Sequence, residues 1–252
     1  MERGSKFSYV CNRCGLCCRD KVITLSPYDV IRIARAAKIS TGIVVARYTI
    51  RRGSVLRFLP DGRCVALGGP RCTIHSGRPL ACRLYPLGLE RAPGADGAGY
   101  VERFLQLEPA AGSLGVYGVA GTIAEFLDGQ GIDPYLDAVA FYYSLVRIFR
   151  ERVAATVDFE RVEPREFWRR AAREALAEAN YDPNRLIDAM FDPDGLGCRS
   201  SSAEDTAVAH VAALDEMAAR ERDGALIAAA AVMLATSLGY APGEVAGTRA
   251  TP

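Results

Sequence analysis

The residues best suited to chemistry are cysteines crowded into one part of the chain. Seven of the eight cysteines fall within the first 82 residues, and four of them form the motif Cys11-x2-Cys14-x2-Cys17-Cys18. Thiolates at two-residue spacing can wrap a soft metal ion or an iron–sulfur cluster. The spacing therefore predicts a metal or cluster site with seven candidate ligands: Cys11, Cys14, Cys17, Cys18, Cys64, Cys72 and Cys82.

The sequence leaves the identity of the metal open. The first three cysteines resemble the triad with which ferredoxin-type segments hold three corners of a [4Fe-4S] cluster, and Cys72 or Cys82 could supply the fourth ligand. Four of these sulfurs would equally satisfy one zinc ion, and seven cysteines with His75 would suffice for two. Because adjacent residues rarely ligate one tetrahedral ion together, we expect either Cys17 or Cys18 to face elsewhere. We favour the iron–sulfur cluster and keep zinc as the alternative.

Length and composition indicate a globular protein. The chain has 252 residues, of which 50% are hydrophobic and 24% charged, enough for one large domain or two small ones. The polar start Met1–Lys6 predicts no secretory signal, and the longest apolar run, Ala225–Leu238, is too short to span a bilayer. We therefore expect a cytoplasmic protein without a membrane partner, where clustered cysteines usually hold metal. A disulfide framework is the alternative.

Charge is divided unevenly along the chain. Residues 1–118 carry 18 Lys and Arg against 8 Asp and Glu, a net charge of +10, whereas residues 119–252 carry 13 against 22, a net charge of −9. A basic surround would offset the negative charge of a thiolate site or attract an anionic ligand, and the two halves could equally dock on each other. The basic residues are scattered, which makes nucleic acid an unlikely partner. A protein partner or substrate stays open.

Sequence patterns predict one well-marked helix and short strands around the cysteines. Ser26-Pro27-Tyr28-Asp29 is typical of a helix start, with serine as the N-cap, and helical spacing continues to Lys38. The other elements predicted here are strands at 22–25 and 100–107, a hairpin of 55–59 with 64–67, and a loop-rich wrap around the site at 72–86.

From about Gly121 the pattern changes to helical periodicity. Asp192–Gly195 is expected to form a turn. Helices are predicted at 134–155, 164–180, 184–191, 204–222 and 225–238. The predicted fold class is thus α+β, an irregular cysteine-rich metal-binding module with short strands over residues 1–118, followed by an all-helical module over 119–252.

The order of these motifs resembles a known family. The motif C-x2-C-x2-CC, the Ser-Pro-x-Asp helix start and the closing run from Cys72 to Pro86 together resemble the YkgJ-type cysteine-cluster family, whose members are described as zinc- or iron-chelating proteins. The resemblance covers roughly residues 7–90 and differs at His75, where the family more often has tyrosine. Besides the seven cysteines, the matching residues are Arg78, Pro79, Arg83, Tyr85 and Pro86.

The resemblance also implies possible activities. Flagellin lysine N-methylases, which use S-adenosylmethionine, share the cysteine pattern. By analogy, Arg78 or Arg83 would pair with the carboxylate of that cofactor, and Tyr85 would orient the incoming amine. The alternative for both arginines is that they bond to loop carbonyls or neutralise the cluster. No glycine-rich nucleotide motif of Rossmann type supports S-adenosylmethionine binding independently.

Three hypotheses follow from the sequence. The first is a metal-binding protein that carries an iron–sulfur cluster or zinc on the cysteine constellation. The second is a cluster-dependent S-adenosylmethionine methyltransferase that acts on protein lysines. The third is a zinc-stabilised interaction module without catalysis, in which the metal only folds the domain.

Overall fold

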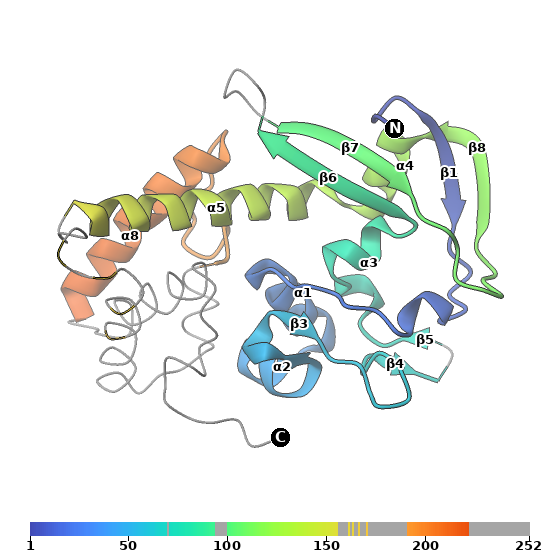
Figure 1. Cartoon of the computed structure of the whole chain (residues 1–252). Coiled ribbons are helices and arrows are strands. Elements are labelled where there is room, and N and C mark those ends of the chain that lie inside the picture. The colour runs from blue at the N-terminus through green and yellow to red at the C-terminus, as the bar shows by residue number, and fades with distance from the viewer. Residues whose placement is uncertain are drawn as a thin grey trace.

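The chain combines helices with short antiparallel strand pairs, in agreement with the predicted α+β class. Figure 1 shows the strand pairs and short helices at one end of the molecule and two long helices at the other. The cysteine-rich part forms the end with the strands. The computed structural model describes residues 1–69, 71–93, 100–155 and 191–221, and in addition residues 161, 163, 166 and 170.

Helix α1 (Pro27–Ala37) begins where the sequence predicts it. The Ser26 hydroxyl accepts a hydrogen bond from the Asp29 N–H at 3.1 Å, and the Asp29 carboxylate accepts one from the Ser26 N–H at 2.7 Å. This reciprocal capping box satisfies two backbone donors that would otherwise lack partners. The helix ends at Lys38, which adopts a left-handed conformation with φ 55°.

The strands form separate two-stranded pairs rather than one sheet. One of the two longer pairs joins strands that lie far apart in sequence, β1 (Lys6–Val10) and β8 (Val116–Thr122). The other joins two strands that follow each other in sequence, β6 (Leu87–Pro93) and β7 (Tyr100–Gln106). The two shorter pairs are β2 (Thr49–Ile50) with β3 (Val55–Leu56), and β4 (Leu67–Gly68) with β5 (Arg71–Cys72). Strand β7 confirms the strand predicted at 100–107.

Two other strand predictions are confirmed only in part. Within the predicted strand 22–25, only Thr24 pairs, through a single bridge to Val55. The predicted hairpin of 55–59 with 64–67 is present next to its turn, where Phe58 bridges Cys64 and the Val65 N–H donates to the Arg57 carbonyl at 3.0 Å, whereas Val55 and Leu56 pair with β2. Local alternation indicates an extended backbone, but packing against the rest of the protein selects the partner strand.

The segment 72–86 contains only short regular pieces, as predicted. A 3-10 turn spans His75–Gly77, and helix α3 spans Leu80–Leu84. Helix α3 places Cys82 next to the other cysteine-bearing segments.

Four further helices complete the described part of the chain. Helix α2 (Thr41–Tyr48) follows α1, and α4 (Ile123–Gln130) follows β8. Helices α5 (Asp133–Ala154) and α8 (Ala203–Glu221) confirm the predictions at 134–155 and 204–222. The turn predicted at Asp192–Gly195 is present, with a hydrogen bond from the Gly195 N–H to the Asp192 carbonyl at 2.9 Å. The helices predicted at 164–180 and 225–238, and nearly all of that at 184–191, lie outside the described residues.

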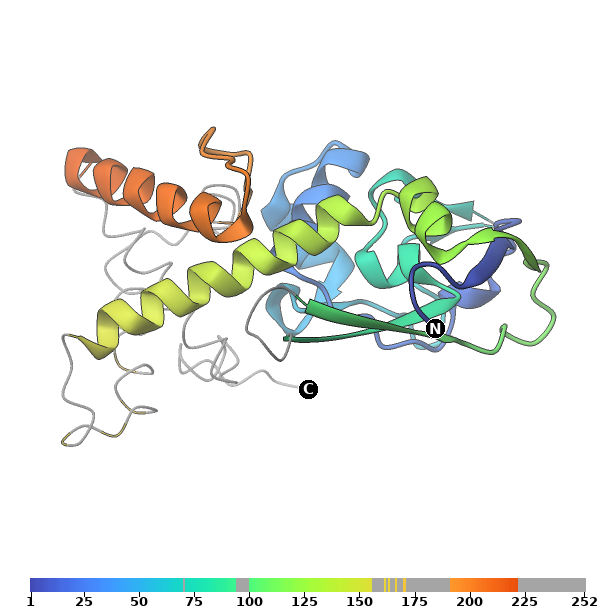
Figure 2. The ribbon, with the colours of Figure 1, turned by 90° about the horizontal axis from the view of Figure 1, so that it is seen from above.

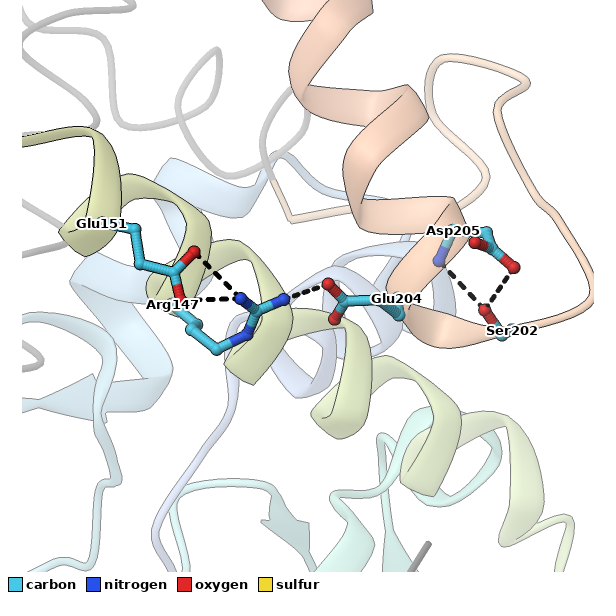
Figure 3. A network of polar contacts seen from close by, with 5 residues as sticks. All are labelled: Arg147, Glu151, Ser202, Glu204 and Asp205. Carbon is cyan, nitrogen blue, oxygen red and sulfur yellow. Dashed lines mark hydrogen bonds and ion pairs between the residues drawn. The ribbon is translucent and has the colours of Figure 1, made fainter. Parts of the chain in front are cut away.

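Helices α5 and α8 lie side by side at one end of the molecule in both views (Figures 1 and 2). Their contact buries Phe141, Leu145 and Val211. At its edge, Arg147 of α5 bonds to Glu151 of the same helix at 2.7 Å and to Glu204 of α8 (Figure 3). Just before α8, the Ser202 hydroxyl accepts a hydrogen bond from the Asp205 N–H at 3.0 Å, which caps the helix start. The exposed ion pairs of Arg147 contribute less to the stability of the contact between α5 and α8 than the buried apolar side chains do.

Two apolar clusters hold the cysteine-rich end together. One lies among β1, β7 and α4 and contains Phe7, Phe104, Ile123 and Leu127. The other surrounds α1 and includes Cys64 among its members. The division into modules 1–118 and 119–252 stays a prediction, and its boundary falls inside β8.

The helical end is attached to this core through α1. Ile31 of α1 packs into the cluster of α5 and α8, and Arg35 pairs with the carboxylate of Asp192, of which 8% is exposed. Across the described part of the chain, the helices are all too short or too polar to cross a membrane.

Candidate metal centre

Most of the clustered cysteines converge on one cavity. Its volume is about 640 Å³, and it is lined by six of the seven candidate ligands: Cys11, Cys17, Cys18, Cys64, Cys72 and Cys82. These residues come from four segments that are separated in sequence. Six of the seven predicted ligands thus line one cavity.

A tight turn and one backbone hydrogen bond bring the first segments together. Gly15 has φ 75°, which favours glycine, and it precedes the 3-10 turn Leu16–Cys18. The Cys18 carbonyl then accepts a hydrogen bond from the Cys64 N–H at 2.9 Å. This bond fastens the segment around Cys64 to the adjacent pair Cys17 and Cys18.

The last two cysteines are placed by short elements. Cys72 lies in β5, opposite Leu67 of β4, and Cys82 lies in α3. The exposed Cys11 lies at the solvent-facing side. Cys14 is outside the wall, and the backbone N–H groups of Leu114 and Leu16 lower the pKa of its thiol by hydrogen bonding.

The thiols converge without forming a closed ligand set. The sulfurs of Cys17 and Cys18 are 4.0 Å apart, and all eight cysteines are free of disulfides. Among the described residues, which include every cysteine, no three His, Cys, Asp or Glu side chains are arranged as a metal site. The donor chemistry therefore fits a thiophilic metal, while no group of three described side chains is arranged to hold one ion.

The environment divides the thiols by acidity. Burial raises the pKa of Cys64 and Cys72, and burial together with neighbouring thiols raises the pKa of Cys82 to about 12. A hydrogen bond from Cys18 lowers the pKa of Cys17 to about 7, and the same bond raises the pKa of Cys18. Cys17 is thus the thiol most readily deprotonated, and a metal would displace protons from the buried ones.

Arg78 lines the cavity but is occupied by neighbouring groups. Its guanidinium donates to the His75 carbonyl at 2.9 Å, lies 3.1 Å from the His75 ring nitrogen Nδ1, and donates to the side chain of Gln130. These bonds join the 3-10 turn at His75 to the end of α4. The contacts agree with the alternative in which this arginine supports the loops.

Arg83 lies outside the cavity wall and bonds to the backbone. It donates to the carbonyls of Arg78 at 3.1 Å, Gln130 at 2.6 Å and Ser76. Its guanidinium also lies over the ring of Tyr135, 4.8 Å from the centroid. Because Gln130 is the last residue of α4, the cation also interacts favourably with the negative end of that helix.

Tyr85 lines the cavity and anchors a distant loop. Its hydroxyl accepts a hydrogen bond from the Ala110 N–H at 3.1 Å, and its ring meets the Tyr9 ring edge-on, with the centroids 6.1 Å apart. The three residues predicted to bind a cofactor are therefore divided. Arg78 and Tyr85 reach the cavity, and Arg83 does not.

Sequence reasoning missed three residues that position the site. Asp29 was assigned only to the start of a helix, yet its carboxylate also accepts a hydrogen bond from the Leu80 N–H at 2.8 Å. Gly77 packs directly on α1, where a Cβ would lie 2.2 Å from the Arg32 carbonyl oxygen. The sequence signal that could have identified Gly77 is its place directly before Arg78 and Pro79. No sequence signal identifies Gln130, because nothing in its local sequence distinguishes it from a surface glutamine.

Comparison with known proteins agrees with this geometry. Residues 10–100 match the family model described as "CxxCxxCC: Putative zinc- or iron-chelating domain". The chain matches neither a curated protein nor a solved structure. The relation to flagellin lysine N-methylases stays a prediction. Residues 10–100, which contain the seven clustered cysteines, are therefore similar to the CxxCxxCC family, the family that the cysteine pattern resembles.

Proposed function

We propose that this chain binds an iron–sulfur cluster, or alternatively zinc, through the cysteines that line the cavity. The observation that carries the proposal is the convergence of six free thiols from four segments on one wall. In a protein without disulfides, this arrangement is typical of metal binding. A bound cluster would supply one-electron redox chemistry, whereas zinc would supply a structural cross-link.

The spacing of the cysteines, rather than their number, favours the cluster. A zinc ion and a [4Fe-4S] cluster each take four ligands, and six cysteines line the cavity. The cavity is also lined by Arg78, whose charge would offset part of the negative charge of a thiolate cluster. The [4Fe-4S] form remains the preferred type, by the spacing of Cys11, Cys14 and Cys17.

Anaerobic purification followed by iron, zinc and acid-labile sulfide analysis tests the proposal. Iron and sulfide in equal amounts would support the cluster, and stoichiometric zinc without sulfide would support the alternative. Protein that takes up neither metal under reducing conditions would overturn both.

Cysteine variants show whether the metal lies in this cavity. Cys64→Ser and Cys82→Ser remove buried thiols from the wall and should lower the metal content. Cys198→Ser is the matched control, because that thiol bonds to the Leu196 carbonyl and lies outside the cavity. The metal content of Cys14→Ser shows whether Cys14, which does not line the cavity, is a ligand.

A lysine N-methyltransferase dependent on S-adenosylmethionine is a second candidate. The observation in its favour is that Tyr85 and Arg78 share the wall with the thiols. The bonds of Arg78 to His75 and Gln130 leave it less able to hold a cofactor carboxylate. Calorimetry of the metal-loaded protein with S-adenosylmethionine tests this candidate, and an absence of binding would remove it.

A zinc-stabilised interaction module without catalysis is the remaining alternative. If the metal only supports the fold, Tyr85→Phe should leave the cellular function intact, because it keeps the ring and removes only the hydroxyl that accepts from the Ala110 N–H. A loss of function with normal metal content and normal stability would contradict a purely structural role.

A further inference from the structure

The cavity is larger than a metal centre requires. Its volume of about 640 Å³ lies within the range of about 300–1,000 Å³ that is typical of small-molecule sites. A single metal ion occupies far less than this, since even a water molecule takes up only about 30 Å³ of liquid. A metal on the thiol wall would therefore leave space for an organic ligand beside it.

The rest of the wall is mainly apolar. It includes Phe58 and Leu89, which are partly exposed, and Leu107, which is 43% exposed, so a ligand can contact them. Ile23, also partly exposed, extends this surface. Such a wall gains free energy by covering the apolar body of a ligand.

Two cations lie where the cavity meets solvent. Arg13 and Lys21 both line the cavity and are both exposed. Neither forms an ion pair with a described residue, in contrast to Arg63, which pairs with Asp61 at 2.5 Å. Glu108 is the one carboxylate among the residues that line the cavity. The rim therefore carries an excess of positive charge that the described part of the protein does not neutralise.

We propose that this cavity binds a small organic carboxylate with an apolar body, whose carboxylate pairs with Arg13 and Lys21 and whose body packs on Phe58, Leu89 and Leu107. The inference rests on the proposed function in one respect, because the metal would occupy the thiol side of the same cavity. It adds a ligand class that a metal site alone does not need.

Fluorescence displacement on the metal-loaded full chain tests this inference. The reporter is 1-anilinonaphthalene-8-sulfonate, and the competitors are 2-naphthoate, its neutral amide and acetate. We expect 2-naphthoate to displace the reporter about tenfold more effectively than the amide, since the amide loses two charge pairs at the rim. We expect acetate to be weaker by about a hundredfold or more, because it lacks the apolar body.

Substitutions at the rim locate the carboxylate. The double variant Arg13→Met and Lys21→Met should weaken 2-naphthoate binding about tenfold while leaving the affinity of the amide unchanged. Arg63→Met is the matched control, because it removes an exposed cation of the same module that lies outside the cavity. Equal affinities for 2-naphthoate and its amide, or an equal effect of the control, would overturn the inference.

Metal content measured on the same samples separates this inference from the proposed function. Full metal loading without 2-naphthoate binding would refute the ligand and leave the metal site standing. Charge-dependent 2-naphthoate binding to protein that takes up no metal would refute the metal site and support the ligand. A double variant that loses metal yet keeps its affinity for 2-naphthoate would assign Arg13 and Lys21 to the metal, and would overturn the inference.

Discussion

The carboxylate of Asp29 fastens the N-terminus of α1 to the N-terminus of α3 through Leu80. One oxygen accepts hydrogen bonds from the Ser26 N–H and hydroxyl at 2.7 and 2.8 Å, and the other accepts one from the Leu80 N–H at 2.8 Å. Asp29 is 3% exposed. Two sequence motifs, Ser-Pro-x-Asp and the run that contains Cys82, are thereby held together by one side chain.

Removing this carboxylate should destabilise the cysteine-rich end. Asp29→Ala removes the acceptor of the Ser26 N–H and hydroxyl and leaves the Leu80 N–H without its partner, and we expect a loss of about 3 kcal/mol in the free energy of unfolding. Urea unfolding followed by circular dichroism measures it. Asp61→Ala is the control, because that exposed carboxylate pairs with Arg63 at the surface and should contribute much less. Equal losses in the two variants would contradict the role of Asp29.

The stability contributed by Asp29 should depend on pH with a defined sign. Burial, partly opposed by the hydrogen bonds from Leu80 and Ser26, raises the pKa of Asp29 above its ordinary value of 3.8. A carboxyl group with a raised folded-state pKa contributes stability that is present below the unfolded pKa and is lost as the pH rises through the folded one. Relative to Asp29→Asn, the native protein should therefore gain stability as the pH is lowered from 7 toward 4 in urea titrations. A difference that stays constant or shrinks would show that burial does not dominate.

Gly77 sets how closely the segment before Cys82 approaches α1. A Cβ at this position would lie 2.2 Å from the Arg32 carbonyl oxygen and 2.5 Å from the Ala36 Cβ, so the backbone would have to shift. We expect Gly77→Ala to cost about 3 kcal/mol. Gly129→Ala in α4 is the matched control, since a Cβ there meets no atom within 4 Å. That change should stabilise the protein by about 0.5–1 kcal/mol. The two variants should differ in sign in the same urea experiment.

Sequence patterns within a single segment predicted the helices correctly where the helix depends mainly on residues of that segment. The α1 start follows from Ser26 and Asp29, and α5 and α8 follow from apolar periodicity over many residues. The convergence of the cysteines followed from their spacing, since motifs with two intervening residues and a shared chemistry have few other uses in such a protein. For the helices, the information lies within one segment.

The features that the sequence did not predict depend on distant partners. Strand β1 pairs with β8 about a hundred residues later, and nothing in Lys6–Val10 specifies that partner. The contact of Asp29 with Leu80 and the carbonyl contacts of Arg83 likewise exist only after the chain has folded. Cys14 shows the same limit, because its spacing matches the motif while its side chain lies outside the cavity wall.

Arg83 should stabilise the fold without belonging to the metal site. Its guanidinium reaches three carbonyls, including that of Gln130, and also lies over Tyr135. A lysine ammonium cannot span these acceptors, so Arg83→Lys should cost about 2 kcal/mol. Metal stoichiometry should stay unchanged, because Arg83 does not line the cavity. Arg103→Lys, on the exposed side of β7, is the control and should be neutral. Loss of metal from a variant of normal stability would instead place Arg83 in the site.

Removing the metal should loosen the cysteine-rich end before the helical end. A metal held by sulfurs of separate segments cross-links Cys18, Cys64 and Cys82, which are joined by long stretches of chain. Its removal should therefore lower the free energy of unfolding by about 3 kcal/mol or more. Thermal unfolding of the loaded protein, with and without a chelator, measures the change. Hydrogen exchange should increase at α1 and α3 more than in the contact of α5 with α8, whose core is apolar. The Cys198→Ser variant should respond to the chelator as the native protein does. An unchanged unfolding midpoint after complete metal removal would mean that the described contacts alone hold this end together.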